Sequence, residues 1–235
     1  MRDDLNRTLI QRGGWVLLGS ALFVGALPTF AQSSADPNKI LRYVFPVAET
    51  GFDPAGTQDL YSAHVHNSIF EGLYTYDYLA SPLKLVPRTA VALPDVSQDG
   101  LTYTFKIQKG IYFAKDAAFK DKARELTAQD YVYSYKRLLD PALRSPNSWL
   151  FDGKFLGMDK VLEQAKKTGK FNYDLPVTGL SAPDRYTLVI KLIQPDQNFP
   201  MLLAHQPAGA VAREVIEHYR DQSGFAMKHP VGTGP

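Results

Sequence analysis

The sequence predicts a protein of the α/β or α+β class, in which strands and helices are interspersed along one chain. Three stretches carry this prediction. Apolar and polar residues alternate with a period of two in Leu101–Ile107 and again in Arg185–Ile193, and such alternation is typical of half-buried strands. In Thr127–Leu139 the apolar residues recur at helical spacing instead, which is typical of a helix with one buried face.

The composition is that of an ordinary globular protein. The 235 residues are 45% hydrophobic, and 26 Lys and Arg residues are balanced by 24 Asp and Glu residues. Such a chain can bury a sizeable core. Its net charge of +2 gives no basic footprint for a nucleic acid, so no nucleic-acid partner is expected. The absence of cysteine excludes disulfides, thiolate metal sites and cysteine nucleophiles.

Residues 1–31 have the organisation of a secretory signal peptide. Three arginines precede an uncharged run of 15 residues, Gly13–Leu27, and small residues follow before Gln32. The run is shorter than the ~20 residues that span a bilayer. We therefore expect cleavage near Ala31/Gln32, a periplasmic product, and a disordered lead-in at residues 32–38. An uncleaved membrane anchor is the alternative.

The first elements after the lead-in are a strand and a helix. Lys39–Val47 is rich in β-branched and aromatic residues and predicts a strand. Asp59–Phe70 predicts a helix, and Gly72 follows as a C-terminal stop. The stripe at helical spacing consists of Leu60, Ala63, His64, Asn67 and Phe70. Two short strands, Leu73–Tyr78 and Leu83–Val86, and a connector, Val91–Ser97, come next.

The two strongest elements have clear boundaries. Asp99-Gly100 supplies a turn before Leu101–Ile107. Lys109-Gly110 then turns the chain into Ile111–Phe113, which we expect to complete a hairpin with that strand. Asp116–Glu125 is charged and predicts a solvated loop.

The predicted helix over Thr127–Leu139 begins with a cap at Thr127 and with Asp130 in its first turn. Asp140-Pro141 ends it. The later segments are a loop at Ser145–Gly153, a helix at Met158–Lys167, a loop between Pro195 and Pro200, and a helix at Ala212–Arg220 that buries Val215 and Ile216. The chain stops in a Gly/Pro-rich turn, His229–Pro235, of a kind that leads into another strand, which favours an interrupted protein.

The sequence contains no recognisable catalytic constellation. His64 and His66 point apart if they lie on a helix, and no carboxylate or cysteine completes a metal site beside them. Gly232-Thr233-Gly234 lacks the remainder of a phosphate-binding loop, and no G-x-S-x-G nucleophile elbow is present. We therefore expect no enzyme activity, no metal and no cofactor, and the pattern favours a binding protein.

Six stretches together resemble the extracytoplasmic solute-binding proteins of peptide ABC transporters, of the large oligopeptide- and dipeptide-binding type (family 5). They occur in that family's order and behind an export signal. They are Gly51–Pro54, Ile69–Tyr74, Ser97–Phe113, Leu126–Pro141, Arg213–Glu217 and Pro230–Pro235. The resemblance covers residues 39–235.

The resemblance implies a class II periplasmic-binding-protein-like lobe, a mixed sheet with flanking helices, over residues 39–235. A second lobe and a returning C-terminal segment would be missing, so the chain is expected to be an N-terminal fragment. The implied function is that of the substrate-binding subunit of a peptide importer, with peptide as ligand and the permease subunits of the inner membrane as partners. The full-length protein is expected to be a monomer.

The resemblance also places residues near a ligand. The loop after the Asp-Pro turn carries Gln58, Asp59 and Leu60, and the loop after Ser145-Pro146 carries Asn147 and Trp149. The alternative for Gln58–Leu60 is a helix-entry loop without a ligand. Other functions stay open: the same scaffold could bind haem, a nickel chelate or an opine-like compound, the chain could be part of a secreted hydrolase, or an uncleaved N-terminus could anchor an interaction protein.

Overall fold

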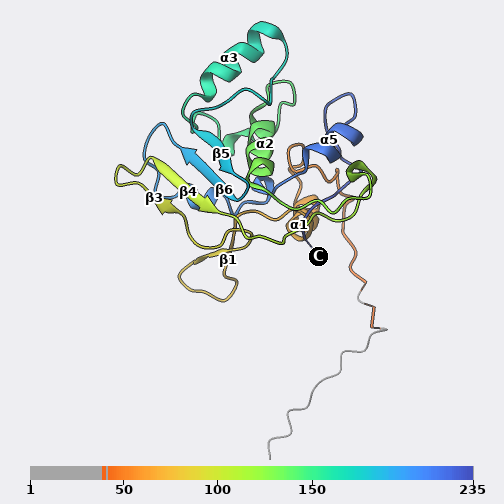
Figure 1. The fold of residues 1–235 in the computed structure, drawn as a ribbon. Coiled ribbons are helices and arrows are strands. Elements are labelled where there is room, and N and C mark those ends of the chain that lie inside the picture. The colour runs from red at the N-terminus through yellow and green to blue at the C-terminus, as the bar shows by residue number, and fades with distance from the viewer. Residues whose placement is uncertain (1–38, 41, 235) are drawn as a thin grey trace, which may run out of the picture. The chain divides into compact units, whose positions relative to one another are not determined.

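The computed structural model describes residues 39, 40 and 42–234. Val44–Pro235 forms one compact unit, distinct from Met1–Tyr43, and every helix and strand described lies in it (Figure 1). The predicted signal peptide at residues 1–31 and the lead-in at residues 32–38 lie outside the described residues.

Helices and strands are interspersed along the described chain, which confirms the predicted class. The helices are α1 (Leu60–Ile69), α2 (Ala128–Leu139), α3 (Met158–Thr168), α4 (Phe199–Leu202) and α5 (Arg213–Tyr219). The strands are β1 (Tyr74–Tyr76), β2 (Leu85–Pro87), β3 (Asp95–Val96), β4 (Thr102–Lys106), β5 (Leu180–Asp184) and β6 (Thr187–Lys191). Short 3-10 helices lie at Ala117–Phe119, Ser148–Leu150 and Gln206–Ala208.

The main sheet has the strand order β3-β4-β6-β5, and β1 pairs with β2 in a separate hairpin (Figure 1). The register of the central pair sets Thr102 opposite Lys191 and Phe105 opposite Leu188. The resemblance implied a mixed sheet, whereas each strand pairing in the described residues is antiparallel. Antiparallel neighbours follow from the short connections between β3 and β4 and between β5 and β6.

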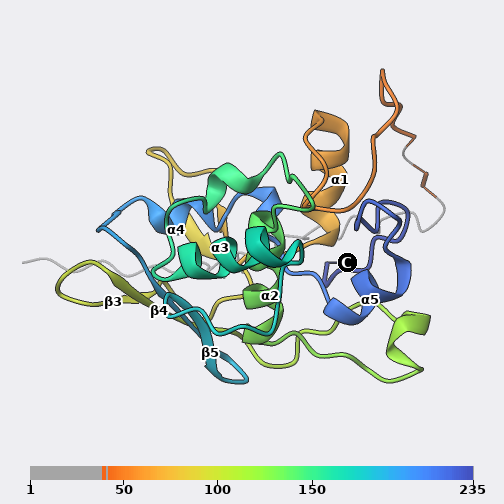
Figure 2. The ribbon, with the colours of Figure 1, turned by 90° about the horizontal axis from the view of Figure 1, so that it is seen from above.

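Helix α2 lies at the centre of the unit, beside the sheet and between α1, α3 and α5 (Figure 2). The helix is capped at Thr127 and has Asp130 in its first turn, as predicted. The Asp130 carboxylate accepts hydrogen bonds from the Thr127 backbone N–H at 2.8 Å and from the Thr127 hydroxyl at 2.9 Å. The predicted single apolar stripe is too narrow: every residue of α2 except Gln129 is buried, because elements pack around the helix on all sides.

Three further local predictions are wrong. The described residues of Lys39–Val47 form no strand. Val44 and Val47 are exposed, and no strand among the described residues pairs with this segment. An apolar sequence forms a strand only where a neighbouring strand is available for hydrogen bonding. Ile111–Phe113 does not return onto β4, whose two edges are occupied by β3 and β6. Tyr112 instead bridges to Glu125.

The third error concerns the buried face of α1. That helix buries Ser62 and His66, whereas Leu60 is open to solvent. The His66 ring packs between Phe52 and Phe70, with ring centroids 6.3 and 5.5 Å away, and its Nδ1 contacts the Gln206 amide. Burial lowers the pKa of His66 to about 4, so the ring is neutral and packs as an aromatic group.

The charged loop at residues 116–125 is only partly solvated. Phe119 is buried against Phe113, with ring centroids 6.1 Å apart. Arg124 forms ion pairs with Asp130 of α2 at 2.6 Å and with Glu214 of α5 at 2.8 Å. The loop therefore links α2 to α5 through Arg124. The charge pattern of the sequence did not indicate this link.

Candidate functional site

Two loops that are far apart in the sequence lie against one another before α1 and after α2. Four side-chain hydrogen bonds to backbone carbonyls join them. The Ser145 hydroxyl donates to Ala55 at 2.6 Å, and the Gln58 amide donates to Pro146 at 3.3 Å. The Asn147 amide donates to Pro54 at 2.9 Å and to Thr57 at 2.8 Å. The two loops, with Leu60 at the first position of α1, carry all five residues that the family resemblance placed near a ligand.

The five residues differ in how far they are free to meet a ligand. Leu60 is 61% exposed and Trp149 is 54% exposed. The Trp149 ring meets His205 edge to face, at a centroid distance of 5.6 Å. Gln58 is exposed as well, whereas Asn147 is only 5% exposed. Gln58, Leu60 and Trp149 are therefore open to solvent, whereas Asn147 is not.

Asp59 caps helix α1. Its carboxylate accepts from the Ser62 backbone N–H at 2.8 Å and from the Thr50 hydroxyl at 2.5 Å, as expected of an N-cap residue. Burial by itself would raise the pKa of Asp59, but the hydrogen bonds from Ser62 and Thr50 outweigh it and hold the pKa well below its usual range. The Asp59 carboxylate is therefore ionised at neutral pH, and its negative charge lies at the N-terminus of α1.

A buried ion pair lies beneath the first loop. The Asp53 carboxylate receives two hydrogen bonds from the Arg137 guanidinium of α2, at 2.9 and 2.8 Å. It also accepts from the backbone N–H groups of Ala55 at 3.0 Å and Ala226 at 2.9 Å. Arg137 donates further to the Gly224 carbonyl at 3.2 Å. One carboxylate thus fastens the first loop to α2 and to the segment after α5.

The electrostatics of this pair are set by its neighbours. Burial alone would raise the pKa of Asp53, but the positive charge and hydrogen bonds of Arg137, with the two backbone N–H groups, lower it. The turn at Asp53-Pro54 was predicted from the sequence, but Arg137 was not predicted as the partner of Asp53. Arg137 follows Lys136 directly, so nothing in the local sequence distinguishes it as the buried cation that requires a carboxylate.

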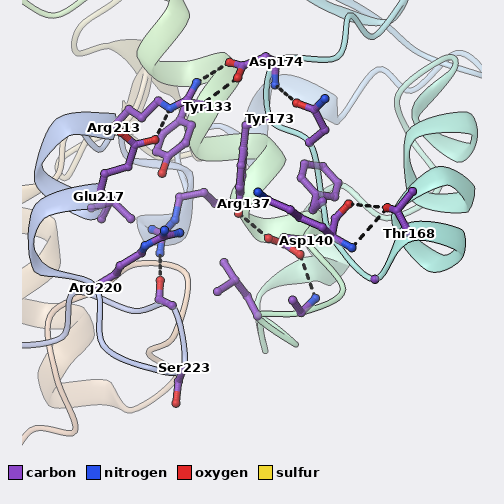
Figure 3. Close-up of a pocket in the computed structure, with 18 of the residues that line it drawn as sticks. Tyr133, Arg137, Asp140, Thr168, Tyr173, Asp174, Arg213, Glu217, Arg220 and Ser223 are labelled. Carbon is purple, nitrogen blue, oxygen red and sulfur yellow. Dashed lines mark hydrogen bonds and ion pairs between the residues drawn. The ribbon is translucent and has the colours of Figure 1, made fainter.

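A cavity of 770 Å³ opens on another side of α2, between α2, α5 and the loop after α3 (Figure 3). The carboxylates that line it already have partners. Asp140 accepts from the Tyr173 hydroxyl at 2.5 Å. Asp174 and Glu217 both bind Arg213, at 2.5 and 2.6 Å. None of the five predicted residues lines this cavity.

The groups in the cavity are arranged as structural pairs. Burial and the adjacent Asp140 carboxylate raise the pKa of Tyr173 above its usual range, so its hydroxyl stays protonated and acts as a donor. Figure 3 shows Arg213 reaching toward Asp174 and Tyr173 pointing to Asp140. The Tyr173 hydroxyl gives the buried Asp140 carboxylate a donor, and the solvent-exposed Arg213–Asp174 pair ties α5 to the loop after α3.

The histidine pair found in the sequence diverges on α1, where His64 is exposed and His66 is buried. Within the described residues, no three His, Cys, Asp or Glu side chains gather in a way that could hold a metal ion. The helices described for this chain include none with the length and apolarity needed to cross a membrane.

Comparison with known proteins gives a consistent group of relatives. The family model described as bacterial extracellular solute-binding proteins, family 5 middle, matches residues 84–235. The periplasmic oligopeptide-binding protein OppA of Escherichia coli K12 is 32% identical over 173 residues, which cover 72% of this chain and 28% of OppA. A dipeptide-binding protein of Lactococcus lactis is 28% identical over 211 residues, covering 90% of this chain and 35% of that protein.

The fold comparison agrees. The periplasmic binding protein DppA from Helicobacter pylori, solved in complex with a peptide, superposes with a TM-score of 0.59 at 26% identity, over 80% of this chain and 34% of DppA. The chain spans about a third of the length of the relatives that it matches. These relatives are named as binding proteins and not as enzymes. The family match covers more than half of the sequence, and the chain therefore belongs to the bacterial extracellular solute-binding proteins of family 5.

Proposed function

We propose that this protein is the substrate-binding subunit of a peptide ABC importer, which captures short peptides outside the cytoplasm and delivers them to a membrane permease. The observation that carries the proposal is the joined pair of loops in front of α1 and after α2. They present Gln58, Leu60 and Trp149 at the surface of a chain whose relatives are named for dipeptide and oligopeptide binding.

The chemistry of these residues suits a ligand of variable sequence. Such a carrier has to bind what all peptides share, which is the extended backbone and the charged termini. An ionised Asp59 offers a carboxylate near a peptide ammonium group. Exposed Leu60 and Trp149 offer apolar area for a side chain without demanding one shape. The proposed role needs no bond-breaking group, and we propose that the protein is not an enzyme.

The proposal includes export. Residues 1–31 would direct the chain across the inner membrane, and cleavage would occur at Ala31/Gln32. N-terminal sequencing of the exported protein tests this: a start at Gln32 supports it, and retention of Gly13–Leu27 supports the membrane anchor. We further propose that the protein acts as a monomer and that closure of a second lobe over the peptide precedes contact with the permease.

Isothermal titration of the natural gene product with mixed di- to hexapeptides tests peptide binding. Heat of binding is expected with the peptides and not with the same free amino acids. Absence of heat across the whole series would overturn the proposal. Mass spectrometry of the ligand that co-purifies with the protein then distinguishes peptides from haem, a nickel chelate or an opine-like compound.

Substitution of Trp149 tests the location of the site. We expect Trp149→Ala to weaken peptide binding roughly tenfold, as loss of an exposed aromatic anchor in a recognition surface does. Tyr112→Ala is the matched control, because Tyr112 is a similarly exposed aromatic residue on a different loop. Equal affinities for the Trp149→Ala variant and the unmodified protein would place the peptide elsewhere.

A further inference from the structure

The segment Pro54–Thr57 presents backbone carbonyls in the interior without a helix or strand to pair them. Pro54, Ala55 and Thr57 are buried, and a buried carbonyl without a donor is costly. Three of these carbonyls receive their hydrogen bonds from the loop that follows α2. The conformation of the first loop therefore depends on side chains of the second.

Asn147 supplies two of the three bonds. Both of its contacts, the carbonyls of Pro54 and Thr57, are acceptors, so only the amide NH₂, with two hydrogens, satisfies them together. The two carbonyls lie at the two ends of the turn, and the Ser145 hydroxyl holds Ala55 between them. Ser145 also accepts from the Asn147 backbone N–H at 3.2 Å, which fixes the two donors relative to each other.

We infer that Asn147 is a positioning residue, which holds the turn Pro54–Thr57 and so sets the conformation of Gln58–Leu60, and that it does not itself touch the ligand. The inference depends on the proposed function in one respect, which is that Gln58–Leu60 contacts the peptide. Asn147 is 5% exposed and both amide hydrogens are used. It increases affinity by pre-organising the loop, because a loop that is already ordered loses less entropy on binding.

The substitution Asn147→Asp tests this directly. An ionised Asp carboxylate has no hydrogen to donate, so its oxygens would repel the carbonyl oxygens of Pro54 and Thr57. The protonated carboxyl group can donate one hydrogen bond. At pH 7 and without peptide, we expect the amides of residues 55–60 to exchange with deuterium about tenfold or more faster than in the unmodified protein at the same pH. The ratio should shrink as the pH falls, because a carboxyl group facing carbonyls has a raised pKa.

Asn172→Asp is the matched control. The Asn172 side chain accepts a hydrogen bond from the Asp174 backbone N–H at 3.0 Å, and a carboxylate retains that role, so residues 55–60 should exchange at the unmodified rate. Ser145→Ala is a milder variant, in case Asn147→Asp does not fold. It removes the bond to Ala55 and the acceptor of the Asn147 backbone N–H, leaves both side-chain bonds of Asn147 in place, and should still accelerate exchange in this turn.

The outcomes separate a positioning role from ligand contact. Faster exchange of residues 55–60 in the free Asn147→Asp protein, recovering at lower pH, supports the inference whether or not peptide binding is detected. Unchanged exchange in that variant and in Ser145→Ala overturns it. A loss of peptide affinity with unchanged exchange in the free protein would show that Asn147 touches the ligand, which also overturns it.

Discussion

At the scale of single residues, the Asp53–Arg137 ion pair is the feature that is costliest to bury. Both side chains are buried, and the two hydrogen bonds between them are 2.9 and 2.8 Å long. Taking two charges out of water costs free energy that the pair recovers only with good geometry and additional donors. Here the N–H groups of Ala55 and Ala226 supply those donors. The pair orients the first loop of the candidate site.

Breaking one side of this pair should therefore be costly. We expect Arg137→Met to lower the free energy of unfolding by about 3–5 kcal/mol, because it leaves the Asp53 carboxylate buried without a counter-charge. Denaturant titration measures the change. Arg220→Met, at an exposed arginine after α5, is the control and should cost less than about 0.5 kcal/mol. Equal stability of the two variants would contradict the assigned role.

The same pair predicts a pH dependence. Because the pKa of Asp53 is lowered in the folded protein, its contribution to stability is present above the unfolded pKa of about 3.9 and is lost as the pH falls through the folded pKa. We therefore expect the denaturant midpoint of unfolding, measured at a series of pH values from 7 downward, to decrease once the pH is below about 4. In Arg137→Met this acid sensitivity should be weaker, since the carboxylate already lacks its partner.

At the scale of elements, the sequence predicted those whose pattern is local. Strands β4 and β6 follow from alternation, and α2 follows from its cap and its stop at Asp140-Pro141. Strands β3 and β5 were missed because they lie at the edges of the sheet, where pairing is short or irregular. β3 has two residues, and β5 contains Pro183 and a shift of register. The partner of a strand depends on the whole fold, as the error at Ile111–Phe113 shows.

The centre and the edge of the sheet should respond differently to truncation. Phe105 of β4 is buried against Tyr74 and Tyr103, with ring centroids 6.1 and 6.3 Å away. We expect Phe105→Ala to cost about 3–5 kcal/mol of unfolding free energy. Val96→Ala on the exposed edge strand β3 should cost less than about 1 kcal/mol. Denaturant titration of both variants measures the difference, and similar losses would mean that β4 is not the centre of the core.

At the scale of the whole molecule, residue patterns alone did not locate the candidate site. The family resemblance drew attention to Gln58–Leu60 and to Asn147 and Trp149, and the structure places their two loops in contact. The bonds between the loops could not be predicted, because they run from side chains to carbonyls about 90 residues away. Such contacts leave no periodicity in the sequence. Ser145 was missed for this reason, and Arg137 was missed because its carboxylate partner, Asp53, is equally remote in the sequence.

The most exposed apolar side chains of the described residues lie on the β1–β2 hairpin. The tip of the β1–β2 hairpin carries Tyr78, 97% exposed, and Leu79, 87% exposed, with Leu83 close by in the sequence. Clusters of this kind promote association between protein molecules. We expect residues 32–235 to associate as their concentration rises, and we expect the double variant Tyr78→Ser, Leu79→Ser to associate less, because it removes the two most exposed apolar groups of the hairpin.

Sedimentation velocity over a concentration series measures this association. Ile193→Ser is the matched control, since it removes an exposed apolar side chain outside the hairpin and should leave association unchanged. Equal reduction by the control would show that general surface apolarity drives association and not the hairpin. A single monomeric boundary for the unmodified chain at every concentration would contradict the prediction, and the hairpin tip would then be an exposed apolar surface that does not mediate self-association.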